Sequence, residues 1–416
     1  MLRKARYNGL CAIAFFCSLN SSSFSMKLHF PRIPQKFFDF LGVLYITTFI
    51  FTIIYAPQPL FAAIHAAFPV GEATISLLIS VIMLSLGVAP LLYGALLSSI
   101  STCRLLQISM FLLAITGLPI FFAHSFPMML VARLGQGLLV PAVLTSLMAH
   151  ISSRFQGAEL QRAMATYIGT TILGGLFGRI ISAVLATWFG WRWAMLLIAL
   201  AILPGIFIVM GFSGETRPRF TKTHWASFRQ VFKNTILLRL LFFEAGGSFV
   251  FLAIGNSLPF YLHSLSGEIS ELRVAFMYSG YALGAFIAFS SGRLVRLFGG
   301  EARTLLLTFC AYFALMPGFT STNIHVIFLV MTLFCVTQFM QHSICPGLIN
   351  RLSESERGVT NGIYLSCYYT GGALGSYLSV LVYVHCSWFA CVAMLMTLVF
   401  AMLCVALSLR KKLSHV

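Results

Sequence analysis

The run AMATYIGTTILGGLFGRIISAVLAT at residues 163–187 and the run VTNGIYLSCYYTGGALGSYLSVLVY at residues 359–383 decide the fold. Each is close in length to the ~20 apolar residues that a helix needs to cross the hydrocarbon core of a bilayer. Each also carries a glycine-rich string, GGLFG at 174–178 and GGALG at 371–375, and the two strings are 197 residues apart (371 − 174). The sequence therefore predicts membrane helices in two repeated halves.

Ten more apolar runs of similar length surround these two. None of the runs alternates as a barrel strand does, and a helix satisfies its own backbone hydrogen bonds in lipid. We therefore predict an all-α membrane protein with about twelve transmembrane helices. The other ten runs fall at 41–62, 74–97, 103–123, 128–150, 193–212, 236–262, 272–293, 303–321, 324–346 and 387–409.

A second recurrence supports the duplication. Arg133 and Gln136 in the fourth run correspond to Gln338 and Gln341 in the tenth, 205 residues later (338 − 133). Matching segments in the same order and, with six helices per half, in the same orientation make a parallel repeat. Chance matches between common membrane residues are the alternative, and the ordered offsets argue against them. The predicted organisation is a segment at 1–38, six-helix bundles at 39–212 and 236–410, a basic loop at 213–235 and a tail at 411–416.

The composition excludes several classes of function. The chain is 59% hydrophobic and 9% charged, whereas soluble domains carry about 25% charged residues. The net charge of +17 lies in short clusters between apolar runs, so no nucleic-acid partner is predicted. The ten cysteines have neither metal-ligand spacing nor a disulfide-framework pattern, and we predict no metal and no cofactor.

The distribution of Lys and Arg predicts the orientation, because basic residues near helix ends favour the cytoplasm. They gather before the first run, in the central loop, in the other even-numbered loops and in the tail. The odd-numbered loops hold only Arg192 and Arg273, both at their edges. Both termini are therefore expected in the cytoplasm. We expect a multi-pass protein of a bacterial inner (plasma) membrane.

The beginning of the chain allows two interpretations. Residues 9–19 follow three basic residues and resemble a signal peptide in outline. Alternatively, Met26 is the true start and residues 1–25 lie upstream of it. We favour the second, because residues 27–38 already form a basic lead-in to the first helix.

Several motifs resemble the major facilitator superfamily, over residues 36–410. LVARLGQG at 130–137 matches that family's arginine-x-x-glutamine-glycine signature. GTTILGGLFGR at 169–179 resembles the glycine-rich antiporter signature of proton-coupled exporters, with Gly175 in place of the usual proline. Together the motifs most resemble bacterial twelve-helix drug and sugar efflux proteins of the arabinose-efflux-permease type.

Two loops resemble the family's glycine-x-leucine-alanine-aspartate-arginine motif. The first starts at Gly94 and has Ser98 where the family usually has aspartate. Its repeat copy starts at Gly292 and also lacks the acid. In the family this acid helps to latch the cytoplasmic gate, so its absence puts that latch in doubt here. We predict that Gly94 and Gly292 take part in gating or packing.

Charges within the apolar runs are candidates for function, because each costs at least ~2.5–3.5 kcal/mol to insert. Glu244 is predicted to carry the proton, and the alternative is a static ion pair. Arg133, by the resemblance, takes part in proton coupling or substrate contact, and the alternative is snorkelling to the interface. Arg179 is assigned to gating or packing, with the same alternative. These candidates are two arginines and one glutamate, so the cavity has an excess of positive charge if neither arginine snorkels. This excess suggests a substrate with a carboxylate or phosphate.

The remaining candidates are polar residues and glycines within the runs. The polar residues are predicted to line a central cavity, although each could instead join helices. The glycines would form a gating or packing seam, because glycine lets two backbones approach closely. The cavity candidates are Gln58, Gln136, Asn256, Gln338, Gln341, His342 and Tyr368, and the seam candidates are Gly174, Gly175, Gly178, Gly371, Gly372 and Gly375.

The predicted function is secondary transport by alternating access, with export of a small molecule in exchange for protons by a monomer. A proton-coupled uptake symporter is the alternative on the same fold. No phosphate loop is present, so ATP is not expected to drive transport directly. A membrane sensor or enzyme is less favoured, because no metal-binding helix motif, nucleophile elbow or cysteine pair is present. We therefore expect that the chain is not an enzyme.

Overall fold

The computed structural model describes residues 35–212, 229, 231–266, 269–353 and 357–413. The predictions for residues 1–25, for the central loop at 213–228 and 230, and for residues 414–416 lie outside this part of the chain. Across the described residues all regular structure is helical, as the apolar runs predict.

The helices of the two halves follow the predicted order. The N-terminal half contains α2 (Gln35–Tyr55) with η1 (Gln58–Leu60) and α3 (Phe61–Ala67), α4 (Glu72–Ser99), α5 (Thr102–Ile115) with α6 (Gly117–Phe121), α7 (Phe126–Arg154), α8 (Gly157–Phe189), and α9 (Trp191–Leu200) with α10 (Pro204–Met210). The C-terminal half contains α12 (Thr235–Ser266), α13 (Glu271–Met277) with α14 (Gly280–Leu297), α15 (Glu301–Leu315) with η2 (Met316–Thr320), α16 (Ile324–Leu352), α17 (Arg357–His385) and α18 (Trp388–Leu413).

The number of membrane helices agrees with the prediction. Ten helical segments in the described chain are long and apolar enough to cross a membrane, and Glu72–Val88 within α4 is a shorter apolar helix. Together with α17 these make twelve helical segments among the described residues. One boundary differs: α4 continues to Ser99, so the loop predicted to start at Gly94 begins at Ile100.

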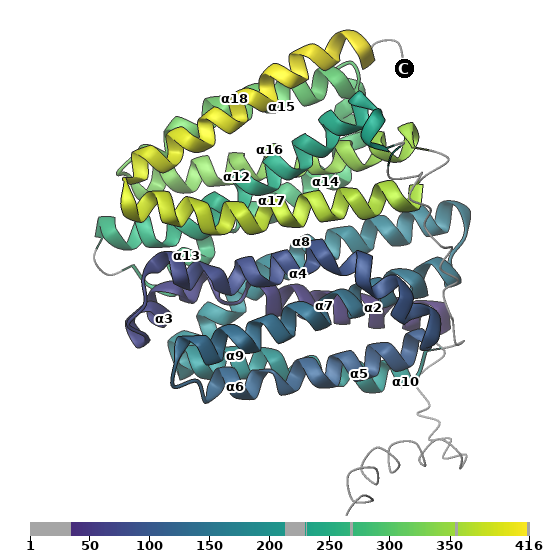
Figure 1. Cartoon of the computed structure of the whole chain (residues 1–416), viewed down its shortest axis with the longest axis vertical. Helices are drawn as coiled ribbons and strands as arrows, with labels where there is room; N and C mark the ends of the chain where they lie inside the picture. Colours follow the sequence, from purple (N-terminus) through teal and green to yellow (C-terminus); the bar gives the residue numbers. More distant parts are fainter. Residues whose placement is uncertain (1–34, 213–228, 230, 267–268, 354–356, 414–416) are drawn as a thin grey trace, which may run out of the picture.

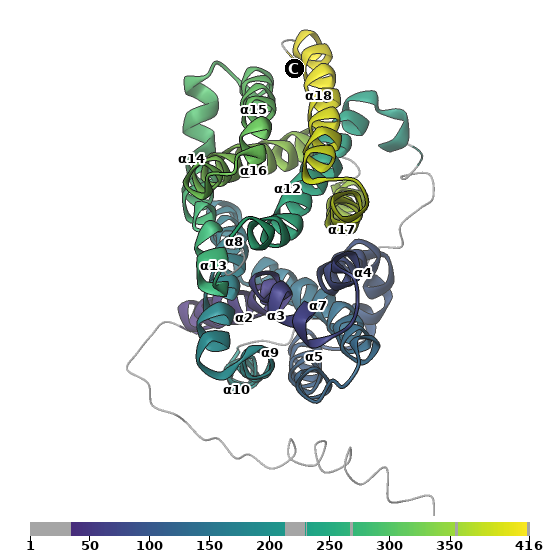
Figure 2. The same ribbon diagram turned by 90° about the vertical axis from the view of Figure 1, so that its left-hand side faces the viewer.

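The two halves lie one above the other, with their helices running in roughly the same direction (Figure 1). Two seams join them: α4 packs along α17, and α8 packs along α13 and α14 (Figure 2). We call the end with Arg104, Arg154, Arg296 and Arg351 the basic end, and the opposite end the far end. The described chain both enters and leaves at the basic end, on the right of Figure 1.

The glycine strings explain how the repeated helices pack. A Cβ on Gly178 of α8 would lie 2.6 Å from Cα of Thr52 on α2. A Cβ on Gly375 of α17 would overlap the backbone of Phe249 on α12. Phe249 follows Thr52 by 197 residues (249 − 52), the same offset that separates the two glycines. The duplication therefore extends from the sequence to the contacts, and in each half glycine is what lets the two backbones meet.

Candidate functional site

Among the residues that the structure describes, three charged side chains are completely buried within the helices. Arg133, Arg179 and Glu244 each have 0% of their surface exposed. Neither arginine therefore reaches the surface of the bundle, which removes the snorkelling alternative for both. Each must find its partners inside the protein, because an unpaired buried charge is very costly.

Arg133 on α7 binds the broken end of the first helix. Pro57 has no N–H group, so the carbonyl oxygen of Ile53 loses its usual helical donor four residues later. Nη1 of Arg133 donates to that oxygen at 2.9 Å. The other donors of the guanidinium go to the carbonyl oxygens of Leu78 (2.9 Å) and Ile54 (2.8 Å) and to Oε1 of Gln136 (2.7 Å).

These contacts join α2, α4 and α7 within the N-terminal half. Gln136, which was predicted to line the cavity, is used here to hold Arg133. The described partners of Arg133 are neutral groups, so its contacts fix the helix break rather than form an ion pair with an acid. Its role in proton coupling stays a prediction.

A chain of polar contacts crosses between the halves, and we call it the crossing network. Nε of Arg179 donates to Oε1 of Gln58 at 2.6 Å. The amide of Gln58 donates to Oδ1 of Asn256, and the amide of Asn256 donates to Ser376. The hydroxyl of Ser80 donates to that of Ser376 at 2.9 Å. The network therefore connects α8, η1, α12, α17 and α4. It joins Gln58 to Asn256, and their predicted place on a cavity wall stays a prediction.

Three tyrosines surround the guanidinium of Arg179. Its carbon Cζ lies 4.2 Å from the ring centre of Tyr55, 4.6 Å from that of Tyr278 and 4.4 Å from that of Tyr281. Nη2 donates to the hydroxyl of Tyr281 at 3.0 Å, and Nη1 donates to the carbonyl oxygen of Gly175 at 2.7 Å. Tyr55 comes from the N-terminal half and the other two rings from the C-terminal half, so the cage exists only when the halves meet.

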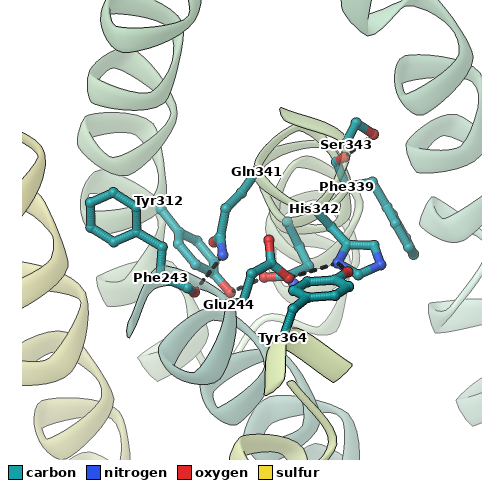
Figure 3. Close-up of polar contacts among 9 residues, drawn as sticks. Phe243, Glu244, Tyr312, Phe339, Gln341, His342, Ser343 and Tyr364 are labelled. Atoms are coloured by element: carbon teal, nitrogen blue, oxygen red, sulfur yellow. Dashed lines mark hydrogen bonds and ion pairs between the residues drawn. The ribbon is translucent and has the colours of Figure 1, made fainter. Parts of the chain in front are cut away.

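Glu244 forms the second charged site, wholly in the C-terminal half (Figure 3). Its Oε2 lies 2.9 Å from Nδ1 of His342, and the hydroxyl of Tyr364 lies 3.4 Å from the same nitrogen. The ring of Tyr368 packs against the imidazole, with 4.6 Å between ring centres. The thiol of Cys345 is also close enough to interact with the carboxylate. A thiol is a weak donor, and Oε1 has no partner of normal hydrogen-bond geometry among the described residues.

Some predicted cavity residues lie apart from these two sites. Gln341 donates to the carbonyl oxygen of Phe243 at 2.5 Å, and Gln338 accepts from the hydroxyl of Tyr312 at 3.1 Å. Both residues join helices within the C-terminal half, the alternative role that the sequence allowed. Gly292 faces open space, so close packing does not require glycine there.

The sequence analysis missed a buried acid, Asp39, and treated Glu244 as the only acid well inside a helix. The helix α2 begins at Gln35 rather than near residue 41, so Asp39 lies within it. The side chain of Asp39 is 1% exposed. Its Oδ2 lies 3.1 Å from Nη2 of Arg154 and 3.8 Å from Nε2 of His150. A search for apolar runs detects only the hydrophobic part of a helix. It therefore misses polar first turns such as those of α2, which contain Asp39. The available signal was Arg154, the partner of Asp39, which also lies just outside an apolar run, four residues after the fourth run ends at residue 150.

Comparisons with known proteins agree with this architecture. The chain is 25% identical over 353 residues to the MFS-type transporter YybF of Bacillus subtilis, covering 83% of this chain and 86% of YybF. It is 26% identical over 348 residues to the inner membrane transport protein YnfM of Escherichia coli, covering 81% and 82% of the two chains.

Solved structures show the same fold at low sequence identity. A bacterial homologue of the human lysosomal transporter Spinster, in an inward-facing and unoccupied conformation, has a TM-score of 0.72 at 13% identity and covers 90% of this chain and 94% of its own. A mutant of the nucleoside transporter NupG has a TM-score of 0.74 at 13% identity, covering 89% and 99%. The family model described as Major Facilitator Superfamily matches residues 40–376. This multi-pass membrane protein therefore belongs to the Major Facilitator Superfamily of transporters.

Proposed function

We propose that the protein exports a small organic molecule across the bacterial inner membrane in exchange for protons, by alternating access, with both termini in the cytoplasm. The observation that carries the proposal is the buried pair of Glu244 and His342. Both side chains can gain or lose a proton, and they lie 2.9 Å apart.

The surroundings of the pair suit a group that changes its protonation state. Glu244 is fully buried, and its Oε1 has no partner of normal hydrogen-bond geometry among the described residues, so that oxygen is the place where a proton would sit. The His342 side chain is 21% exposed, whereas that of Glu244 is fully buried. His342 would therefore be the group through which a proton reaches the carboxylate from the protein surface. A static ion pair would satisfy both carboxylate oxygens more completely, because a buried charge needs all of its hydrogen bonds.

The crossing network supports alternating access. It lies in the far half of the molecule, where Ser80 is eight residues from the start of α4 and Ser376 nine residues from the end of α17. The rings of Phe61 and Phe260 also stack between the halves, 5.5 Å apart. Towards the basic end, by contrast, each ion pair in the described chain joins residues of one half. Opening the far end would have to break the network, whereas opening the basic end would not.

We expect Asn256→Ala to open the far end more often. The substitution removes the hydrogen bond between Gln58 and Asn256, which joins the halves. A hydrogen bond contributes about 1 kcal/mol, so the opening equilibrium should shift by roughly fivefold. Ser76 on α4 is fully buried, and its carbonyl oxygen accepts from Ser376, so it is reached only when the halves part. The measurement is the rate at which a membrane-impermeant maleimide labels Ser76→Cys in a cysteine-depleted chain.

Asn361→Ala is the matched control, because Asn361 donates an amide hydrogen bond to Asn350 within one half. Labelling in this variant should stay at the parent rate. Equal rates in Asn256→Ala and Asn361→Ala would show that the crossing network does not hold the far end closed.

Export rests on the resemblance of residues 169–179 to the antiporter signature, and it can be tested in cells. Cells lacking the protein are compared with cells that carry it by untargeted mass spectrometry of internal solutes. We expect at least one small organic solute to accumulate in the cells that lack the protein. Everted membrane vesicles with an imposed pH gradient should then release protons when that solute is added. Lower internal levels in the cells without the protein would mean uptake and would overturn the proposed direction.

A further inference from the structure

The guanidinium of Arg179 is a buried cation without an acidic partner among the described residues. Two acids are buried there, Asp39 and Glu244, and both are already paired, with Arg154 and His342 respectively. In the described chain Arg179 contacts an amide oxygen, a carbonyl oxygen, a phenol and three aromatic faces. These groups stabilise the cation, but none cancels its charge. The space between the halves therefore has a positive excess at Arg179.

The guanidinium also keeps donors in reserve. It has five N–H groups, and the described chain accepts one from each of its three nitrogens. One N–H therefore remains on Nη1 and one on Nη2, which is the arrangement that binds a carboxylate through two hydrogen bonds. Because the hydroxyl of Tyr281 accepts from Nη2, its own hydrogen is free to donate to the same anion.

The tyrosine rings also connect this cation to the proton site. Tyr368 packs on His342 and is close enough to Tyr55, Tyr281 and Glu244 to interact with each electrostatically. The two charged sites are thus separated by aromatic side chains, which offer flat apolar faces to an organic molecule. An anionic group at Arg179 and a proton at Glu244 would be held on opposite sides of these rings.

We propose that Arg179, with Tyr55, Tyr278 and Tyr281, binds the carboxylate group of the transported solute, which makes that solute an organic carboxylate. The inference rests on the proposed transport function. Binding at Arg179 also acts on the crossing network, because Arg179 holds Gln58. A carboxylate that draws the guanidinium away weakens the contact between η1 and α12, so substrate arrival favours opening of the far end.

The test compares matched pairs of probes on the purified full-length protein. The pairs are acetate with acetamide, benzoate with benzamide and succinate with succinamide, at equal ionic strength. The readout is the midpoint of thermal unfolding, because a ligand that binds only the folded state raises it. We expect at least one carboxylate to raise the midpoint while its amide does not. If no carboxylate exceeds its amide, the inference is wrong.

Variants identify the site. Arg179→Gln should weaken the response to the carboxylate by about tenfold or more, because it removes the charge and the paired donors. Tyr281→Phe keeps the ring and should weaken the response several-fold, which tests the site even if Arg179→Gln does not fold. Arg192→Gln is the matched control, since Arg192 also packs on an aromatic ring, Trp191, at 4.4 Å, but lies at the far end. A response that survives in Arg179→Gln, or is lost equally in Arg192→Gln, would place the anion elsewhere.

The two proposals fail separately. Unfolding measurements need no pH gradient and no transport, so they report the anion site alone. Carboxylate binding without proton release in vesicles would remove the proposed coupling and leave the site intact. Proton-coupled export of a neutral solute, with no carboxylate binding, would remove the site and leave the coupling intact.

Discussion

Glu244→Gln should abolish transport driven by a pH gradient while leaving the protein folded. Glutamine has the size of glutamic acid and can still hydrogen-bond with His342, but it cannot exchange a proton. Without a titratable carboxylate the pair no longer carries a proton through the transport cycle. The measurement is solute movement in proteoliposomes with and without an imposed pH gradient, together with solute exchange at equal pH. Solute exchange should persist in Glu244→Gln. In exchange the transporter carries solute in both directions across the membrane, so no net proton transfer is needed.

Glu301→Gln is the matched control for this variant. Glu301 pairs with Arg351 near the basic end and is partly exposed, and exposed ion pairs contribute at most about 1 kcal/mol. Its substitution should leave transport driven by the pH gradient close to the parent rate. Unchanged gradient-driven transport in Glu244→Gln would remove Glu244 from the mechanism, and the buried pair would then be structural.

Arg133→Met should strongly destabilise the protein. Methionine fills part of the volume but leaves the carbonyl oxygens of Ile53, Ile54 and Leu78 without their donor. Each buried unsatisfied group costs about 1–3 kcal/mol, so we expect a net loss of about 3 kcal/mol or more. The measurement is the thermal unfolding midpoint and the yield of monodisperse protein after extraction from the membrane.

Arg133→Lys separates a structural role from a role in coupling. Lysine keeps the charge and three donors but loses the planar fork that reaches four oxygens at once. If Arg133 chiefly fixes the helix break at Pro57, Lys should recover part of the stability, and the folded fraction should retain proton coupling. Parent stability in Arg133→Met would contradict the structural role. Loss of coupling in a fully stable Arg133→Lys would support the role that the family resemblance implies.

The membrane helices were predictable because one physical rule governs them. A segment that crosses lipid must make all of its backbone hydrogen bonds itself, so it is a helix, and it must be long and apolar. Runs such as 163–187 could therefore be identified as membrane helices from the sequence. The repeat was predictable because duplicated packing needs the same small residues, and Gly178 and Gly375 keep their places in both halves. Asp39 escaped because hydropathy detects the apolar body of a helix and not its polar first turns.

The sites were only partly predictable. A charge in an apolar run stands out because of its cost, which is why Glu244, Arg133 and Arg179 could be named. The partner of a buried charge is set by which helices pack together, and no local pattern contains that information. The pairing of Glu244 with His342 joins residues 98 positions apart, and that of Gln58 with Asn256 joins residues 198 apart.

The sequence alone determined the helical membrane fold, the two repeated halves and three of the buried charges, because these follow from length, hydropathy and the cost of charge in lipid. Only the tertiary structure decided what each charge contacts. It gave Arg133 the carbonyl oxygens of a helix broken at Pro57, Arg179 a cage of tyrosines from both halves, and Glu244 a histidine and a spare oxygen. The physical reason is that a buried polar group takes its character from its neighbours, and those neighbours are brought together only when distant helices pack.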